Sequence, residues 1–367
     1  MKLFKLLGIQ VQIHFSWWFI FALLTWSLAV GFFPQYYAGL SSTMYWVMGA
    51  VSAVLLFFSV VLHELSHSIV AKFRGIKVES ITLFFFGGVA GIEDEDLTPK
   101  SEFLMAIAGP LFSLVLGGLF FVINRANGSV FVSAITFYLY QINFILAIFN
   151  LVPGFPLDGG RAFRAILHWK YKDIKKATRI ASKGGKFFAG VLIFLGFIGL
   201  LSGTGGGLWF ILLGGFLYFI AGVSYQQVLI KDVLQKIKVK ELMKSTYITI
   251  SPDIPFNEVL KKYLKEEQES FIVKKGKEFV GILNFRILGK IRPKLQRKLT
   301  VSSLVIPKAQ LKMLHHDDDC YTAYKLLTKN NVDALPVVSG ARVKGVLLRK
   351  SLEHRLLVEV RYGVANS

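Results

Sequence analysis

Residues 51–71, VSAVLLFFSVVLHELSHSIVA, place two histidines and a glutamate inside an apolar run long enough to cross a bilayer as a helix. On a helix the positions i and i+4 share one face, so His63 and His67 can present both imidazoles to a single metal ion. Glu64 lies about 100° further round the helix, close enough to contact a water on that ion. A glutamate between histidines within an apolar span is costly to bury and indicates a functional site. A buried hydrogen-bonded polar cluster and an ion-conducting pathway are the alternatives.

The composition excludes most classes of soluble protein. The 367 residues are 53% hydrophobic, include 33 Phe and have a mean hydropathy of +0.52, whereas soluble domains are about 45–50% apolar. On a soluble chain the net charge of +20 would suggest a nucleic-acid partner. On so apolar a chain the simpler partner is a lipid bilayer, with the basic groups of the protein on the cytoplasmic side. We therefore expect no nucleic-acid partner. The single cysteine, Cys320, excludes an intrachain disulfide and a thiolate-based structural zinc site.

Six apolar runs are candidate transmembrane helices. They cover residues 15–33, 44–71, 102–123, 131–151, 187–203 and 207–229. Between the second and third runs, the β-prone residues 78–86 are followed by two glycines and a second short β-prone stretch, residues 89–92. Non-helical backbone at membrane depth is tolerated only where protein or a watery cavity covers it. The sequence therefore predicts a small β-hairpin against the helical bundle, near its cytoplasmic face.

The distribution of Lys and Arg predicts the orientation, because these residues are enriched on the cytoplasmic side. Nine of them lie at residues 161–186 against the single acid Asp173, whereas residues 34–43 and 202–206 carry no charge. All basic segments fall on one side of the membrane if the N-terminus is cytoplasmic and the number of spans is even. This predicts six spans in a cell membrane (inner or plasma membrane), with both termini in the cytoplasm.

A third metal ligand is needed, because a catalytic zinc usually has three protein ligands and an open position for water. Asp158 stands out in the apolar part of the chain, within residues 150–161, NLVPGFPLDGGR. Two prolines and a glycine prevent a regular helix before it, and the two glycines after it permit close backbone approach. Such a segment can fold back and project a carboxylate into the bundle. The alternative is a helix N-cap in an interfacial loop.

Together these motifs resemble the site-2 protease family of intramembrane zinc metalloproteases. The resemblance rests on the HExxH helix at residues 63–67 paired with the Leu-Asp-Gly-Gly-Arg motif at residues 157–161, and on shorter matches at residues 13–17, 86–90 and 108–110. It implies one zinc ion per chain, held by His63, His67 and Asp158, with Glu64 as general base. It also implies that Asn150 helps to hold the substrate backbone or the tetrahedral oxyanion.

The chain changes character near residue 230. Residues 231–367 hold 27 of the 43 basic residues and 14 of the 23 acidic residues. A weak twofold repeat at about residues 237–292 and 298–355 resembles a tandem pair of cystathionine-β-synthase (CBS) domains. The resemblance implies a regulatory pair that can form a homodimer and that, in the family, often binds adenine nucleotides.

The residues at the nucleotide-contacting positions of such pairs differ in this chain. Family members carry a Thr or Ser and an Asp just after the Gly-hydrophobic-hydrophobic strand. Here those positions are Asn284 and Ile287 in one copy and Leu348 and Ser351 in the other. The acid that contacts the ribose is missing from both copies, so we expect any adenine-nucleotide binding to be weak.

The sequence thus predicts a polytopic α-helical membrane protein with two parts. Residues 1–230 form about six transmembrane helices with a small membrane-associated β-hairpin, and residues 231–367 form a soluble α+β tandem CBS pair. The resemblance implies a zinc metalloendopeptidase of the site-2 type that cuts transmembrane protein substrates near the cytoplasmic side of the bilayer, in regulated intramembrane proteolysis. The alternative is a non-proteolytic metal-binding transporter or scaffold. A transporter should show internal symmetry between the halves of its membrane region, which we do not detect, and a scaffold needs no complete set of three ligands and a base.

Overall fold

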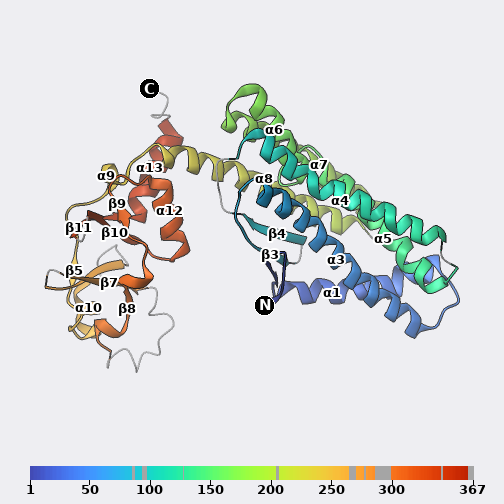
Figure 1. Cartoon of the computed structure of the whole chain (residues 1–367), viewed down its shortest axis with the longest axis horizontal. Helices are drawn as coiled ribbons and strands as arrows, with labels where there is room; N and C mark the ends of the chain where they lie inside the picture. The colour runs from blue at the N-terminus through green and yellow to red at the C-terminus, as the bar shows by residue number, and fades with distance from the viewer. Residues whose placement is uncertain are drawn as a thin grey trace. The chain divides into compact units, whose positions relative to one another are not determined.

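The computed structural model describes the whole chain except residues 85–86, 93–96, 127, 204–205, 264–269, 277, 286–298, 340–341 and 363–367. The chain forms two compact units, Met1–Gln226 and Gln227–Ser367 (Figure 1). The division falls inside one long helix, α8 (Gly207–Gln235). The first unit is mainly helical and contains the candidate site, whereas the second is mixed α and β.

Six helices among the described residues are long and apolar enough to cross a membrane, which confirms the predicted number. They are the first span Ser16–Tyr36, α3 (Ser42–Phe73), α4 (Pro99–Ala126), α5 (Val130–Asn150), α7 (Ile174–Leu201) and α8. The fifth span begins well before the apolar run at residue 187. The side chain of Asp173 caps α7 there, because it accepts hydrogen bonds from the backbone N–H of Lys175 at 2.9 Å and of Lys176 at 3.0 Å.

The first span is not a uniform α-helix. It consists of α1 (Ser16–Ser27), a π-helical turn η1 (Leu28–Phe32) and the short helix α2 (Phe33–Tyr36). Its end packs on α3 and α5 through a cluster that includes the fully buried side chains of Phe33, Met48 and Leu139. This cluster joins the three helices, so the irregular turn lies beside a tightly packed core.

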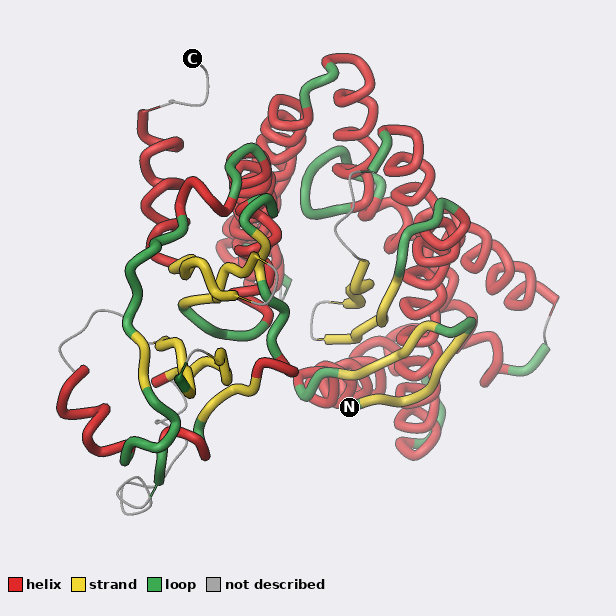
Figure 2. The backbone as a smooth tube through the Cα atoms, turned by 60° about the vertical axis from the view of Figure 1, so that its left-hand side comes forward, coloured by secondary structure: helices red, strands yellow, loops and turns green. Residues whose placement is uncertain are grey.

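A four-stranded sheet packs against the helices of the first unit. Its order is β1 (Lys2–Leu6), β2 (Ile9–Ile13), β3 (Val78–Phe84) and β4 (Gly87–Ile92). The predicted hairpin corresponds to β3 and β4, which pair antiparallel, and β2 runs parallel to β3. The hairpin of β1 and β2, which begins at the N-terminus in Figure 2, was not predicted. Buried residues of β2 and β3 pack with Leu65 of α3 and Met105 of α4, so the sheet lies directly behind the helix that carries the two histidines.

Between α5 and α7 the chain forms a loop at residues 151–157 and the helix α6 (Asp158–Tyr171). The prolines in the loop interrupt helical hydrogen bonding, as expected. The basic segment predicted between the fourth and fifth spans is therefore α6 and the first half of α7. Asp158 is the first residue of α6, and this placement fixes the orientation of its carboxylate.

The second unit repeats one order of elements, strand, helix, strand, strand, as the twofold repeat predicts. The first copy comprises α9 (Val239–Leu242), β5 (Thr249–Ile250), α10 (Phe256–Tyr263), β6 (Ser270–Lys275) and β7 (Glu278–Asn284). The second comprises η3 (Val301–Ser303), β8 (Val305–Pro307), η4 (Lys308–Gln310), β9 (Leu314–His315), α12 (Cys320–Lys329), β10 (Ala334–Ser339), β11 (Arg342–Leu348) and α13 (Arg349–Tyr362). The strands form two sheets with the orders β5-β6-β7-β8 and β11-β10-β9. The nucleotide position Ile287 lies outside the described residues.

Candidate metal centre

His63 and His67 project from α3 toward the same point, as their spacing on one helix requires. Each residue is only 3% exposed, and their ring centroids lie 4.9 Å apart. Burial of two polar rings within an apolar helix is costly unless both ring nitrogens find partners. The structure supplies a partner for each nitrogen, as the following contacts show.

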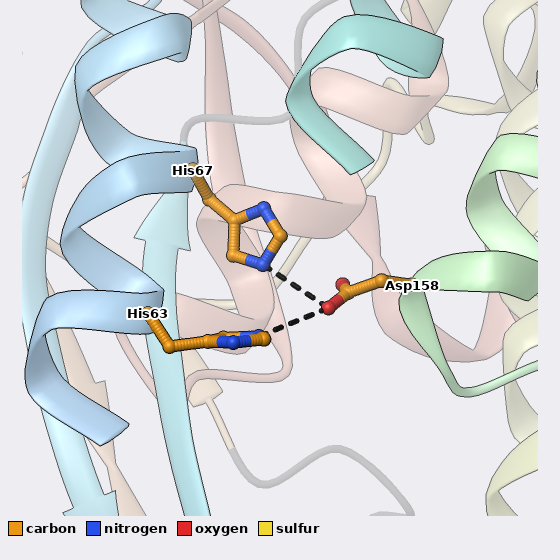
Figure 3. Close-up of side chains that lie close together, drawn as sticks. All are labelled: His63, His67 and Asp158. Atoms are coloured by element: carbon orange, nitrogen blue, oxygen red, sulfur yellow. Dashed lines mark hydrogen bonds and ion pairs between the residues drawn. The ribbon is translucent and has the colours of Figure 1, made fainter. Parts of the chain in front are cut away.

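Asp158 approaches the two histidines from α6. Its Oδ2 atom lies 3.2 Å from Nε2 of His63 and 3.1 Å from Nε2 of His67 (Figure 3). The three ligand atoms lie within 4.8 Å of one another. The N-cap of α6 is Leu157, and no side chain caps this helix end. The carboxylate thus faces the histidines and does not serve as the N-cap of an interfacial loop.

The outer nitrogens of the two rings are held by α4. Nδ1 of His63 lies 2.8 Å from Oγ of Ser113, and Nδ1 of His67 lies 2.6 Å from the carbonyl oxygen of Met105. A carbonyl oxygen only accepts hydrogen bonds, so Nδ1 of His67 carries the proton. In the neutral ring Nε2 then offers its lone pair toward Asp158. Metal-binding histidines typically have this arrangement, with the far ring nitrogen bonded to a carbonyl or another polar group.

The donor set fits a zinc ion. A lone pair that faces a carboxylate oxygen at 3.1 Å is stable only when a proton or a cation lies between the two atoms. In a tetrahedral zinc site with bonds of about 2.0–2.1 Å, neighbouring ligand atoms lie about 3.3 Å apart. The two N···O distances of 3.2 and 3.1 Å agree with that spacing. Two imidazoles and one carboxylate leave a fourth position open, as in catalytic zinc sites.

A cavity of about 660 Å³ opens onto these ligands. Glu64 and Asn150 line it together with His63, His67 and Asp158, so all five candidate residues border one space. Its apolar walls come from α3, α5, α8 and the loop before α6, and include Val60, Leu146, Phe149, Leu157, Leu213 and Leu217. The size is typical of a small-molecule or peptide site with a few convergent polar groups.

The general-base candidate Glu64 lies against strand β4. A Cβ atom on Gly88 would come within 2.6 Å of Cγ of Glu64, so a larger residue at position 88 would displace the carboxylate.

The amide of Asn150 donates one hydrogen bond from Nδ2 to the carbonyl oxygen of Leu146 at 2.9 Å. That bond lies within α5 and orients the amide, which has a second N–H to donate.

Several residues of the site were not predicted as such. Met105 and Ser113 contact the histidines from α4, and Arg161 of α6 lines the cavity one turn after Asp158. The Ala-Gly-Pro motif at residues 108–110 is one of the shorter family matches, and the sequence alone predicts no role for it. A Cβ atom on Gly109 would lie 2.6 Å from Nε2 of His63 and 2.2 Å from Nε2 of His67, so this glycine makes room for the ligands.

Comparison with known proteins gives two family matches. The profile of peptidase family M50 matches residues 51–137 and 124–193. The profile of the CBS domain matches residues 239–288 and 301–357. The first match contains both histidines and Asp158, and the second covers both copies of the repeat.

Individual relatives extend over most of the chain. Rip3 of Mycobacterium tuberculosis is 32% identical over 310 residues, which are 83% of this chain and 79% of that protein. Zinc metalloprotease MJ0392 of Methanocaldococcus jannaschii is 30% identical over 361 residues, 96% of this chain and 94% of that protein. Among solved structures, the site-2 protease from Methanocaldococcus jannaschii is 35% identical, with a TM-score of 0.44, and the match covers 61% of this chain and 94% of that one.

Proposed function

The chain belongs to peptidase family M50 and carries C-terminal CBS domains, and from that premise we propose that it is an intramembrane zinc endopeptidase that hydrolyses peptide bonds of transmembrane proteins. One observation carries the proposal. The ligand atoms of His63, His67 and Asp158 converge, and Glu64 borders the same cavity, within a bundle of membrane-spanning helices. We further propose that each chain binds one zinc ion there.

The residues of the cavity divide the chemistry among them. A zinc ion, when bound, supplies Lewis acidity and lowers the pKa of a bound water toward 7. Glu64 takes the proton from the attacking water and passes it to the leaving amine. Asn150 donates its second amide N–H to the substrate carbonyl, where negative charge develops in the transition state. His67 keeps its Nε2 lone pair directed inward because the carbonyl oxygen of Met105 accepts the hydrogen bond from Nδ1, and Ser113 holds Nδ1 of His63.

The substrate binds as an extended chain, because a helix hides its carbonyl groups in its own hydrogen bonds. Strand β4 is at one edge of the sheet formed by the described residues, and its first residues, Gly87 and Gly88, border the cavity. An exposed strand edge can pair with an incoming peptide through main-chain hydrogen bonds. This arrangement supports strand addition as the way in which the scissile bond is presented.

Cleavage takes place near the cytoplasmic side of the cell membrane in this proposal. Asp158 begins α6, and the basic residues of α6 and of the first half of α7 follow it closely. Because such residues mark the cytoplasmic side, the metal centre lies toward that side and both termini are cytoplasmic. The CBS pair then regulates the protease from the cytoplasm and takes no part in the chemistry.

The experiment that tests the proposal separates metal binding from proton transfer. The purified full chain is assayed for zinc content and for cleavage of a model transmembrane peptide. We expect Glu64→Gln to keep zinc but to lower kcat by about 100-fold or more, because the typical contribution of a general base is 10²–10⁴-fold. Asp158→Ala should reduce both zinc content and activity. A wild-type cleavage rate in Glu64→Gln, or a wild-type chain that binds no zinc, would contradict the proposed function.

A further inference from the structure

Helix α4 contacts the candidate centre along one face. Glu102, Met105, Gly109 and Ser113 follow one another at intervals of three or four residues, so they share a side of the helix. All four are buried. Met105 and Ser113 hold the histidine rings, and Gly109 leaves space for them. Glu102 is the member of this row that the catalytic proposal does not use.

Glu102 forms an ion pair with Arg164 of α6. Its Oε1 accepts a hydrogen bond from Nε of Arg164 at 2.7 Å and a second from Nη2. Glu102 is 1% exposed, so its carboxylate depends on this guanidinium for its neutralisation. A guanidinium that donates two hydrogen bonds to a carboxylate fixes direction as well as distance. The pair therefore sets how α6 docks on α4.

The same arginine also holds the loop before α6. The guanidinium of Arg164 lies over the ring of Phe155, 4.9 Å from its centroid. The start of α6 fits closely against this loop, because a Cβ atom on Gly160 would come within 2.2 Å of the carbonyl carbon of Gly154. The loop and the first turn of α6 thus pack tightly against each other, and Asp158 is the first residue of that helix.

We propose that Glu102 and Arg164 are a positioning pair that sets the carboxylate of Asp158 against His63 and His67, so that α4 organises all three ligands. The inference rests on the proposed function, since it concerns the same metal site. A buried ion pair is often no more stabilising than an apolar pair of similar volume. A role in orientation therefore accounts for this pair better than a role in stability alone.

The prediction concerns the affinity for zinc, not only activity. Loss of a residue that orients a metal ligand typically costs about 10- to 100-fold in metal affinity. We expect Glu102→Gln and Arg164→Gln each to weaken zinc binding by that factor, measured by competition with a chelator on the full chain in detergent. The visible absorption bands of the cobalt-substituted protein should also shift, because the geometry of the Asp158 ligand changes.

A matched control lies on the same helix. Asn124 of α4 donates hydrogen bonds from Nδ2 to the carbonyl oxygen of Ser133 at 2.7 Å and to Oγ1 of Thr136 at 3.2 Å, away from the site. Asn124→Ala should lower thermal stability but leave zinc affinity and the cobalt spectrum unchanged. The exchanged pair, Glu102→Arg with Arg164→Glu, should recover part of the affinity that each single variant loses.

The outcomes separate this inference from the proposed function. If the wild-type chain binds no zinc, the proposed function fails. If it binds zinc and both Gln variants, correctly folded, stay within twofold of its affinity, only the positioning role fails. An equal loss in Asn124→Ala would also overturn it, because the effect would then reflect general loosening of α4. If the Gln variants do not fold, Glu102→Asp and Arg164→Lys take their place, and the same thresholds apply.

Discussion

Gly109 of α4 faces His67 of α3 so closely that a Cβ atom built on the glycine would lie 2.2 Å from Nε2. The imidazole cannot swing away freely, because Nδ1 of the same ring lies 2.6 Å from the carbonyl oxygen of Met105, also on α4. The two contacts hold the ring from both sides. The absence of a side chain at position 109 is therefore a condition for the two Nε2 atoms to meet Asp158.

Substitution of this glycine should weaken metal binding without unfolding the chain. We expect Gly109→Ala to weaken zinc binding at least tenfold, because the methyl group occupies the space into which both Nε2 atoms point. Gly118→Ala is the matched control, since it lies on the same helix and its added Cβ would meet no atom within 4 Å beyond the neighbouring backbone of that helix. Zinc content after dialysis against a chelator measures both variants. Equal retention of zinc in the two would show that the rings can move aside.

The part of the site that lies on one helix could be predicted from sequence. His63, Glu64 and His67 needed only the helical period, which fixes their relative directions. Asp158 lies 91 residues after His67. Its pairing with the histidines was predicted from the need for a third ligand and from the prolines and glycines around it, and the family resemblance added to that prediction. That resemblance and the CBS pair are confirmed by the family matches and by relatives that cover most of the chain.

The contacts from α4 could not be predicted in the same way. Met105, Ser113 and Glu102 reach their partners through the packing of helices that are distant in sequence, and local spacing does not encode such packing.

The β1–β2 hairpin is different, because the sequence of β2 carries the alternating pattern of a strand. Ile9, Val11 and Ile13 alternate with polar residues, and Leu7 and Gly8 both adopt positive φ angles, as in a two-residue hairpin turn.

Substrates with a weakened helix should be cut faster. Peptide bonds reach the cavity only after the helix opens locally, and Gly and Pro lower the cost of opening by about 1 and 3 kcal/mol respectively, relative to Ala. A transmembrane peptide with a Gly-Pro pair near the cut site should therefore have a kcat/KM at least tenfold above that of an all-Leu/Ala peptide of equal length. Mass spectrometry of the products locates the cut. Equal rates for the two peptides would argue against an extended substrate.

The single cysteine should resist alkylation in the folded protein. Cys320 is fully buried at the start of α12, and burial raises the pKa of its thiol to about 12. At pH 8 the thiolate fraction is then about one in ten thousand, against roughly one in four for an unperturbed thiol. Iodoacetamide should modify the folded chain at least 100-fold more slowly than the denatured chain, and the rate should rise with pH while the fold persists. Equal rates in the two states would contradict this burial.

Adenine-nucleotide binding by the CBS pair should be weak and depend on charge. Asn284, at one of the predicted contact positions, is 3% exposed and donates a hydrogen bond from Nδ2 to the carbonyl oxygen of Asn331 at 2.9 Å, so its amide is already engaged. The family's ribose-binding acid is replaced by Ser351 in the second copy. Affinity for ATP then comes from lysine and arginine contacts with phosphate, which salt screens. Calorimetry on the full chain should show that tripolyphosphate binds as tightly as ATP and that adenosine does not bind. The affinity for ATP should fall at least tenfold between about 50 and 500 mM NaCl. Micromolar ATP binding that persists at the higher salt would mean that other residues recognise the nucleoside.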